Sequence, residues 1–215
     1  MNKADTFDFA KVGEFDKHIN LSIPNYTSLC NIFLNITKEF MSAETKVVDL
    51  GCSTGKFLSS LDKIEDCEYI GIDTLDFADR KQDFKFLQKD AETIKDIDSC
   101  SVIISMFFLQ FLGEPKRKRM LKLIKEKVEE GCVLLISEKV LLEDTRIQTV
   151  LHKMHLQEKR KGFSDKEILD KDLRLGVTMY CKTQNELLEE LKEIGNPTQV
   201  WQSYGFVGYV VKKRR

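Results

Sequence analysis

The chain has 215 residues, 42% of them hydrophobic, so it is long enough to bury a full core without disulfides or metals. Its formal net charge of −1 excludes a global field that would recruit nucleic acid. Six scattered cysteines without a Cys-x-x-Cys pair, together with only three histidines, argue against a zinc site and favour reduced thiols in a cytoplasmic protein. We find no signal-peptide core and no run of 18 apolar residues, so we expect no membrane association.

The predicted elements alternate between strand and helix along the chain. Strands are expected at 46–50, 68–73, 84–90, 101–106 and 132–138. Helices are expected at 27–40, 55–61, 115–127, 144–173 and 185–194. Two last strands, 199–201 and 206–211, are typical of a terminal antiparallel hairpin. This alternation predicts an α/β fold with a doubly wound, mostly parallel sheet, formed by 1–215 as a single domain.

The most informative stretch joins the first predicted strand to the helix after it. The strand ends in Asp49-Leu50, and a tight turn follows, Gly51-Cys52-Ser53-Thr54-Gly55. The next strand ends at Asp73. Glycines let the backbone approach a ligand closely at the mouth of a parallel sheet, and a carboxylate at the second strand end can accept hydrogen bonds from both hydroxyls of a ribose. Together they predict an adenosine-type site.

Three other motifs compete for these residues. A phosphate-binding loop needs four residues between its glycines and a Ser or Thr after its lysine, but three residues stand here and Phe57 follows Lys56. A serine-hydrolase elbow needs a histidine at a later strand end, whereas His152 and His155 lie in a charged helical stretch. A dinucleotide site would have glycine in place of Ser53, so a ligand without a pyrophosphate is favoured.

S-adenosylmethionine fits the remaining pattern. Its ribose would meet Asp73, its amino-acid tail would lie along the glycine turn, and its cationic sulfonium would favour a nearby Asp49. Asp90, at the end of the third predicted strand, is placed to accept a hydrogen bond from the adenine amino group. Three acidic strand ends in succession therefore predict a transferase with the Rossmann-like fold of class I methyltransferases.

With these pieces the chain resembles the carboxy-S-adenosyl-L-methionine synthase family, whose members look like ordinary methyltransferases and serve wobble-uridine modification in transfer RNA. The resemblance rests on Ser22-Ile23-Pro24-Asn25-Tyr26, on the glycine turn, on Ser137-Glu138-Lys139, and on the stretch 159–168. It implies cofactor contacts at Tyr26, Gly51, Cys52, Ser53, Asp73, Thr74, Asp90 and Ala91. It also implies an N-terminal lid and helix over 1–40, a helical cap over 144–180, and a homodimer built around that cap.

Two positions depart from the family. Met106 stands at the end of the fourth strand, in the cofactor site, where the family has asparagine. Asp172 stands where the family has an arginine that reaches across the dimer interface to the extra carboxylate. An acid there would repel a carboxylate that arginine would bind through two charge-assisted hydrogen bonds. Arg174 is two residues further on, which is about 200° around a helix.

We therefore expect methyl transfer from S-adenosylmethionine, with polar groups near the methyl at Glu138, Tyr180 and Tyr204. The alternative is synthesis of carboxy-S-adenosylmethionine from a prephenate-like donor, for which Lys139, Arg146 or Arg174 would be cationic partners. Glu138 and Lys139 are equally interpretable as a solvated ion pair.

A second alternative is a non-catalytic relative that binds S-adenosylmethionine or RNA. The RNA reading rests on three basic clusters, 116–119, 159–161 and 212–215. Because each cluster is short, a solvated helix face or a charged tail is the more usual explanation of such clusters.

Overall fold

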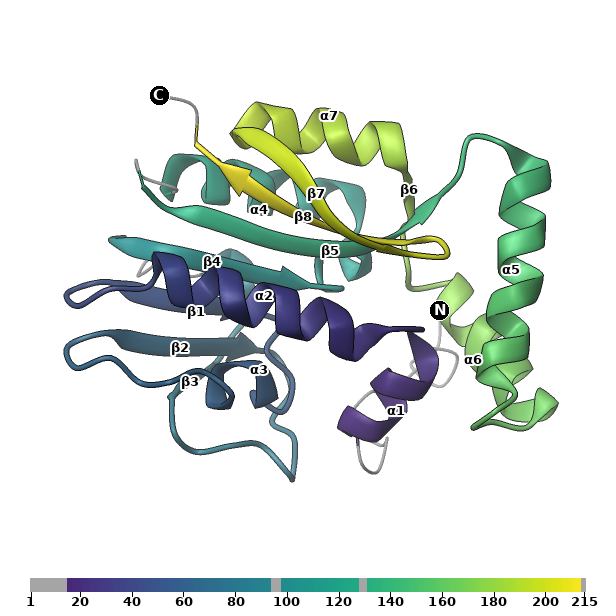
Figure 1. The fold of residues 1–215 in the computed structure, drawn as a ribbon, viewed down its shortest axis with the longest axis horizontal. Helices are drawn as coiled ribbons and strands as arrows, with labels where there is room; N and C mark the ends of the chain where they lie inside the picture. The colour runs from purple at the N-terminus through teal and green to yellow at the C-terminus, as the bar shows by residue number, and fades with distance from the viewer. Residues whose placement is uncertain (1–14, 94–97, 128–130, 214–215) are drawn as a thin grey trace.

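One twisted sheet organises the molecule, with its main strands in the order β3-β2-β1-β4-β5-β8-β7 (Figure 1). The computed structural model describes residues 15–93, 98–127 and 131–213. The strands are β1 Lys46–Leu50, β2 Glu68–Asp73, β3 Lys85–Gln88, β4 Cys100–Met106, β5 Val133–Leu141, β6 Lys182–Thr183, β7 Asn196–Ser203 and β8 Phe206–Lys212. The helices are α1 Phe15–Ser22, α2 Tyr26–Phe40, α3 Lys56–Ser59, α4 Glu114–Lys127, α5 Thr145–Lys159, α6 Asp165–Gly176 and α7 Gln184–Ile194, with short 3-10 turns at Ala91–Thr93 and Leu109–Phe111.

The first five strands run parallel, and the last two form the expected antiparallel hairpin. β1 lies between β2 and β4, β3 and β5 extend the sheet on either side, and β8 pairs antiparallel with both β5 and β7. The central strands are almost wholly apolar because helices cover both of their faces; Val102–Ile104 and Val133–Ile136, for example, have no exposed surface. The strand order reverses between β1 and β4, which is where open α/β sheets bind ligands.

Helices cover the two faces of the sheet in separate layers (Figure 1). On one face, α4 and α7 pack side chains such as Ile124 and Leu191 onto the sheet. On the other face, α2 and α3 contribute Leu29, Phe33 and Leu58 to a second core. The predicted doubly wound sheet is therefore confirmed.

A group of helices lies beyond the carboxyl ends of the parallel strands. α1, α5 and α6 are gathered at this end of the sheet (Figure 1). α5 begins after Asp144, whose carboxylate accepts hydrogen bonds from two backbone N–H groups, and α6 begins with a capping box between Ser164 and Glu167. The region expected to be helical over 144–173 is thus two separately capped helices, the second of which continues to Gly176.

Several expectations are adjusted by the structure. β3 ends at Gln88, two residues before Asp90, and β5 continues to Leu141. α1 and β6 were not predicted. The first 14 residues of the expected lid, and the last two of the terminal basic cluster, lie outside the described residues. In the part of the chain that the structure describes, none of the helices combines the length and the apolar character needed to span a bilayer.

Candidate functional site

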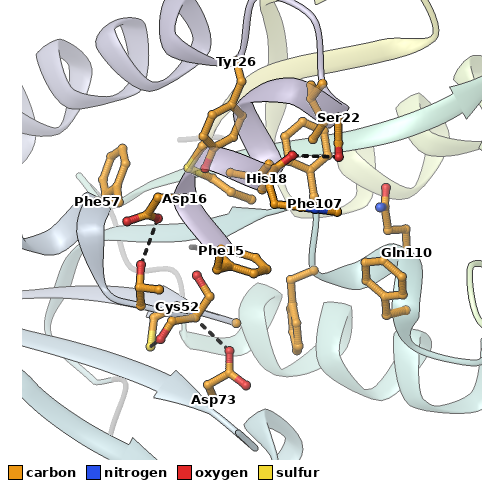
Figure 2. Close-up of a pocket in the computed structure, with 18 of the residues that line it drawn as sticks. Phe15, Asp16, His18, Ser22, Tyr26, Cys52, Phe57, Asp73, Phe107 and Gln110 are labelled. Atoms are coloured by element: carbon orange, nitrogen blue, oxygen red, sulfur yellow. Dashed lines mark hydrogen bonds between the residues drawn. The ribbon is translucent and has the colours of Figure 1, made fainter. Parts of the chain in front are cut away.

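A cavity of about 840 Å³ lies at the carboxyl ends of β1, β2 and β4. Figure 2 shows side chains from α1, the glycine turn and the end of β2 around this space. All ten residues predicted for the cofactor site line it: Tyr26, Asp49, Gly51, Cys52, Ser53, Asp73, Thr74, Asp90, Ala91 and Met106. Their contact with a ligand stays a prediction, but the fold brings them together.

The glycine turn is shaped by residues in the left-handed region. Gly51 has φ of 74° and Gly55 has φ of 71°, where side chains are strained. Neither position has room for a side chain. A Cβ on Gly55 would lie 2.1 Å from the ring of Phe84, and a Cβ on Gly51 would lie 2.6 Å from the ring of Phe108. Both glycines are therefore required for the turn to lie where it does.

Asp73 is oriented by backbone donors on both of its carboxylate oxygens. The N–H of Ser53 donates to Oδ2 and the N–H of Leu75 donates to Oδ1, each over 2.9 Å. Burial raises the pKa of Asp73, while these hydrogen bonds act in the opposite direction. Each oxygen can accept a further hydrogen bond, so the carboxylate is held ready for a diol such as that of a ribose.

Asp49 is more deeply buried, with 4% of its surface exposed. Burial, followed by repulsion from Asp73, raises the pKa of Asp49 to about 7. Tyr26 lies close by on α2, where burial raises the pKa of its phenol well above the usual value. Two neighbouring carboxylates in a buried wall favour a cationic ligand, because a positive charge would stabilise both in ionised form.

Helix α1, which the sequence analysis missed, docks onto the glycine turn. Thr54 Oγ1 donates to Asp16 Oδ1 over 3.0 Å, and Lys56 Nζ lies 4.0 Å from Asp16 Oδ2. The ring of Phe15 meets that of Phe77 edge to face, with centroids 5.1 Å apart. The signal for this helix was present in the apolar spacing of Phe15 and Ile19, four residues apart.

The wall expected to receive the adenine contains Asp90 and Ala91. Asp90 Oδ2 accepts a hydrogen bond from Lys116 Nζ over 2.8 Å, so the carboxylate is anchored from α4. Met106, at the end of β4, lines the same cavity beside Phe107, whose φ of 53° turns the chain out of the sheet. Among the described residues, no set of three His, Cys, Asp or Glu side chains is arranged to hold a metal.

A further wall of the cavity carries lysines from three elements. Lys139 extends from β5, Lys159 from the end of α5, and Lys171 from α6. The side chain of Lys159 forms an ion pair with Asp172 over 2.9 Å. Asp172, which stands at the family's arginine position, therefore lies beside a lysine in the cavity wall. Of these three lysines, only Lys139 was expected near the ligand, and Lys159 was expected in an exposed basic cluster.

The four predicted catalytic side chains do not line the cavity. The fully buried Glu138 carboxylate forms an ion pair with Arg117 over 2.9 Å, so its interpretation as a solvated pair with Lys139 is wrong. Arg117 also bonds Glu190 on α7, which makes Glu138 part of a core network. Tyr180 and Arg174 are exposed, and Tyr204 borders a separate shallow hollow. Arg146 is exposed as well and lies away from the cavity.

Comparison with known proteins agrees with the fold. Residues 47–131 match the family model of a methyltransferase domain. A solved S-adenosylmethionine-dependent methyltransferase from Clostridium acetobutylicum superposes with a TM-score of 0.60 at 13% identity, covering 93% of this chain and 96% of that one. The plantazolicin methyltransferase BpumL, solved in complex with SAH, superposes with a TM-score of 0.62 at 12% identity, covering 93% and 87% of the two chains.

Relatives found by sequence share a higher identity with this chain than those solved structures do, and they align with almost all of it. A carboxy-S-adenosyl-L-methionine synthase from Nautilia profundicola is 29% identical, covering 91% of this chain and 88% of the relative. One from Shewanella piezotolerans is 30% identical, covering 96% and 92%. The chain therefore belongs to the carboxy-S-adenosyl-L-methionine synthase family and is a S-adenosylmethionine-dependent enzyme with the class I methyltransferase fold.

Proposed function

We propose that this enzyme transfers a carboxyl group to the sulfonium methyl of S-adenosylmethionine, giving carboxy-S-adenosyl-L-methionine. The observation that supports the proposal is the distribution of charge around the cavity. Asp49 and Asp73 lie on the wall formed by the strand ends, whereas Lys139, Lys159 and Lys171 lie on the wall beneath the cap. A cationic nucleoside and an anionic donor would each meet a wall of opposite charge.

Carboxyl transfer balances with these two substrates alone. The bond between the donor and its carboxylate breaks, and a new carbon–carbon bond forms to the methyl carbon. The proton lost by that carbon goes to the remainder of the donor. The protein's part is to hold both reactants in line and to keep water away from the reacting carbon. A prephenate-like acid, as the family resemblance implies, is the donor to test first.

Methyl transfer to a separate acceptor is the second candidate. Met106 in place of the family's asparagine and Asp172 in place of its arginine favour it, since both changes fall on the cavity wall. Methyl transfer remains compatible with the absence of Glu138 from the cavity, because transfer of a methyl group from a sulfonium does not require a general base in every enzyme. A non-catalytic binding role would leave both reactions unobserved.

Mass spectrometry of the nucleoside separates these candidates. The purified enzyme is denatured and its released ligand is weighed, and a second sample is first incubated with S-adenosylmethionine and prephenate. Carboxyl transfer predicts a nucleoside heavier than S-adenosylmethionine by one carbon dioxide. Recovery of only S-adenosylmethionine after both treatments would overturn carboxyl transfer. Recovery of its demethylated product would overturn carboxyl transfer and favour methyl transfer.

We also propose a cytoplasmic homodimer that acts in wobble-uridine modification of transfer RNA. A dimer is supported by exposed apolar side chains on the cap helices, Ile147, Val150, Met154, Leu169, Leu173 and Val177. Direct RNA binding has less support, because Arg117 and Lys159 are buried and two of the three basic clusters thereby lose a member. Steep salt dependence of transfer-RNA binding would support such contact, and no binding at low salt would exclude it.

A further inference from the structure

Gln110 is a buried polar residue of the cavity wall that the predicted site did not include. It lies in the 3-10 turn after β4, lines the cavity, and has 4% of its surface exposed. In Figure 2 its amide lies well apart from Cys52 and Asp73, which belong to the wall expected to hold the nucleoside. A buried amide needs hydrogen-bond partners for its oxygen and for its N–H groups, because burying an unpaired polar group costs free energy.

The side chain of Gln110 is oriented by backbone groups of two other segments. Its Oε1 accepts a hydrogen bond from the N–H of Lys139 over 2.7 Å. Its own backbone carbonyl accepts one from the N–H of Tyr180, also over 2.7 Å. The opposite orientation of the amide would set its NH2 group against the Lys139 donor, so only one orientation is compatible with these contacts. The direction of Nε2 is therefore fixed as well.

The Nε2 atom of Gln110 has only a weak acceptor. Among the described residues its hydrogen bond goes to the thioether sulfur of Met179, 3.3 Å away. A thioether accepts weakly, and the amide nitrogen has two N–H groups to satisfy. Met179 lines the same cavity, and its flexible side chain can move aside for a stronger acceptor. The wall of the cavity therefore carries an oriented donor whose capacity is largely unused by the described residues.

We infer that Gln110 donates a hydrogen bond from Nε2 to an uncharged oxygen, a carbonyl or a hydroxyl, of the second substrate that shares the cavity with the nucleoside. Such an oxygen would replace the weak contact with sulfur by a bond of ordinary strength. A neutral amide cannot offset the charge of an ion, but it satisfies an uncharged oxygen fully. The inference rests on the proposed function, since it takes the group donor as the second substrate, and it names a residue that selects that donor.

Prephenate, the donor to test first, carries both kinds of uncharged oxygen, a keto oxygen and a ring hydroxyl. Phenylpyruvate keeps the keto oxygen and lacks the hydroxyl, and phenylpropionate has a carboxylate but neither of the two. Each acid is titrated by calorimetry into enzyme saturated with S-adenosylhomocysteine. The three probes therefore distinguish the two uncharged oxygens from each other and both of them from a carboxylate.

The informative variant is Gln110→Met, which removes the amide, keeps an unbranched side chain of similar length and changes no charge. We expect the affinity for prephenate to fall about 5- to 100-fold, because its oxygen would enter the cavity without a partner. The affinity for phenylpropionate should be unchanged. A parallel loss for phenylpyruvate would identify the keto oxygen as the acceptor, and an unchanged phenylpyruvate affinity would identify the hydroxyl.

Two further variants separate this bond from a structural role of Gln110. Gln148→Met is the matched control, because Gln148 Oε1 also accepts from a backbone N–H, that of Leu142 over 2.9 Å, but Gln148 does not line the cavity. It should bind the three acids as the wild type does. Met179→Leu removes the sulfur and keeps the Gln110 amide, so the affinity for prephenate should be retained. Unchanged affinity for S-adenosylhomocysteine shows that each variant is folded.

An undiminished affinity of Gln110→Met for prephenate would overturn the inference. So would an equal loss for phenylpropionate, which would show that the variant displaces Lys139 rather than removing a bond to an uncharged oxygen. An equal loss in Met179→Leu would also overturn it, because the contact with sulfur would then be what matters. The proposed function fails in a different way, when the wild type binds prephenate through Gln110 but forms no carboxylated nucleoside. A wild type that binds no prephenate contradicts both.

Discussion

Asp49 and Asp73 differ in their surroundings although both stand at strand ends beside the same turn. Asp73 accepts two backbone hydrogen bonds that fix its plane, whereas Asp49 is governed by its burial and by the charge of Asp73. The first arrangement suits a neutral diol with defined geometry. The second suits a charged atom, for which distance counts more than direction.

Replacing Asp73 with alanine tests the proposed ribose contact. Asp73→Ala removes two acceptors for the ribose hydroxyls, each hydrogen bond to a charged group being worth about 1.5–3 kcal/mol. We expect the affinity for S-adenosylhomocysteine, measured by calorimetry, to fall at least about tenfold. Asp62→Ala is the control, because Asp62 is exposed and forms an ion pair with Lys38 on α2. Equal affinities for both variants would contradict the assignment.

The raised pKa of Asp49 predicts a pH dependence with a definite sign. In the unliganded protein Asp49 is largely protonated below about pH 7. A sulfonium favours the ionised form, so binding releases a proton and the affinity for S-adenosylmethionine should rise as the pH increases through 7. S-adenosylhomocysteine has no positive sulfur and should show a shallower slope.

Dissociation constants for both nucleosides between pH 6 and 8 measure this difference. The ratio of the two affinities should lose its pH dependence in Asp49→Asn, where no proton is released. A ratio that stays constant in the wild type would rule out the assignment of the sulfonium to this wall.

At the level of elements, the sheet was the most predictable part. Strands β1, β2 and β4 are short and mostly apolar, and Asp49 and Asp73 near the ends of β1 and β2 follow from the same local pattern. The ten residues predicted for the cofactor site line one cavity because strand ends and the glycine turn are defined by neighbours in sequence. Helix α1 was missed because it is only eight residues long and is held mainly by distant contacts such as Asp16 with Thr54.

The burial of Lys159 and Lys171 and the role of Glu138 could not be predicted either, because they too depend on contacts between residues far apart in the sequence. Arg117 belongs to a run of four basic residues that resembles a solvated helix face, and only the packing of α4 against the sheet turns it inward. Lys159 and Lys171 likewise sit in charged helices, and their burial depends on how α5 and α6 meet α1. Sequence patterns carry no information on such rotations.

The Arg117–Glu138 pair predicts a large effect of a single substitution on stability. Arg117→Met leaves a buried carboxylate without its partner, so the free energy of unfolding at neutral pH should fall by about 3–5 kcal/mol. Adding Glu138→Leu should recover most of this loss, since two apolar side chains can replace a buried pair. Urea unfolding measures both variants. A double variant no more stable than the single one would show that the pair is not the relevant unit.

For the whole molecule, the cap helices present an apolar outer face. Leu169 is 60% exposed and Leu173 is 65% exposed, four residues apart on α6. Exposed apolar groups of this kind mark surfaces that associate with other proteins. The same helices carry Lys159 and Lys171 on the cavity side. An interface on the outer face would therefore hold in place the two helices that line this side of the cavity.

A charge on this face tests the dimer. Leu173→Glu should convert a dimer to a monomer at micromolar concentration, because a buried carboxylate at the interface would lack a partner. Size-exclusion chromatography with light scattering measures the mass. Gln202→Glu places the same side chain at an exposed position of β7 and should leave the mass unchanged. A wild-type enzyme that is already monomeric would contradict the proposed homodimer.

The contact between His18 and Lys171 joins residues 153 positions apart. By contrast, β1 and β2 pair after a connection of 17 residues, 51–67, and closing a longer loop costs more chain entropy. We therefore expect the part of the cavity that carries Asp49 and Asp73 to form early in folding, and the contact between α1 and α6 to form near the end. During synthesis on the ribosome, the chain would acquire the ability to hold an adenosine before it acquires the ability to choose which group that adenosine carries.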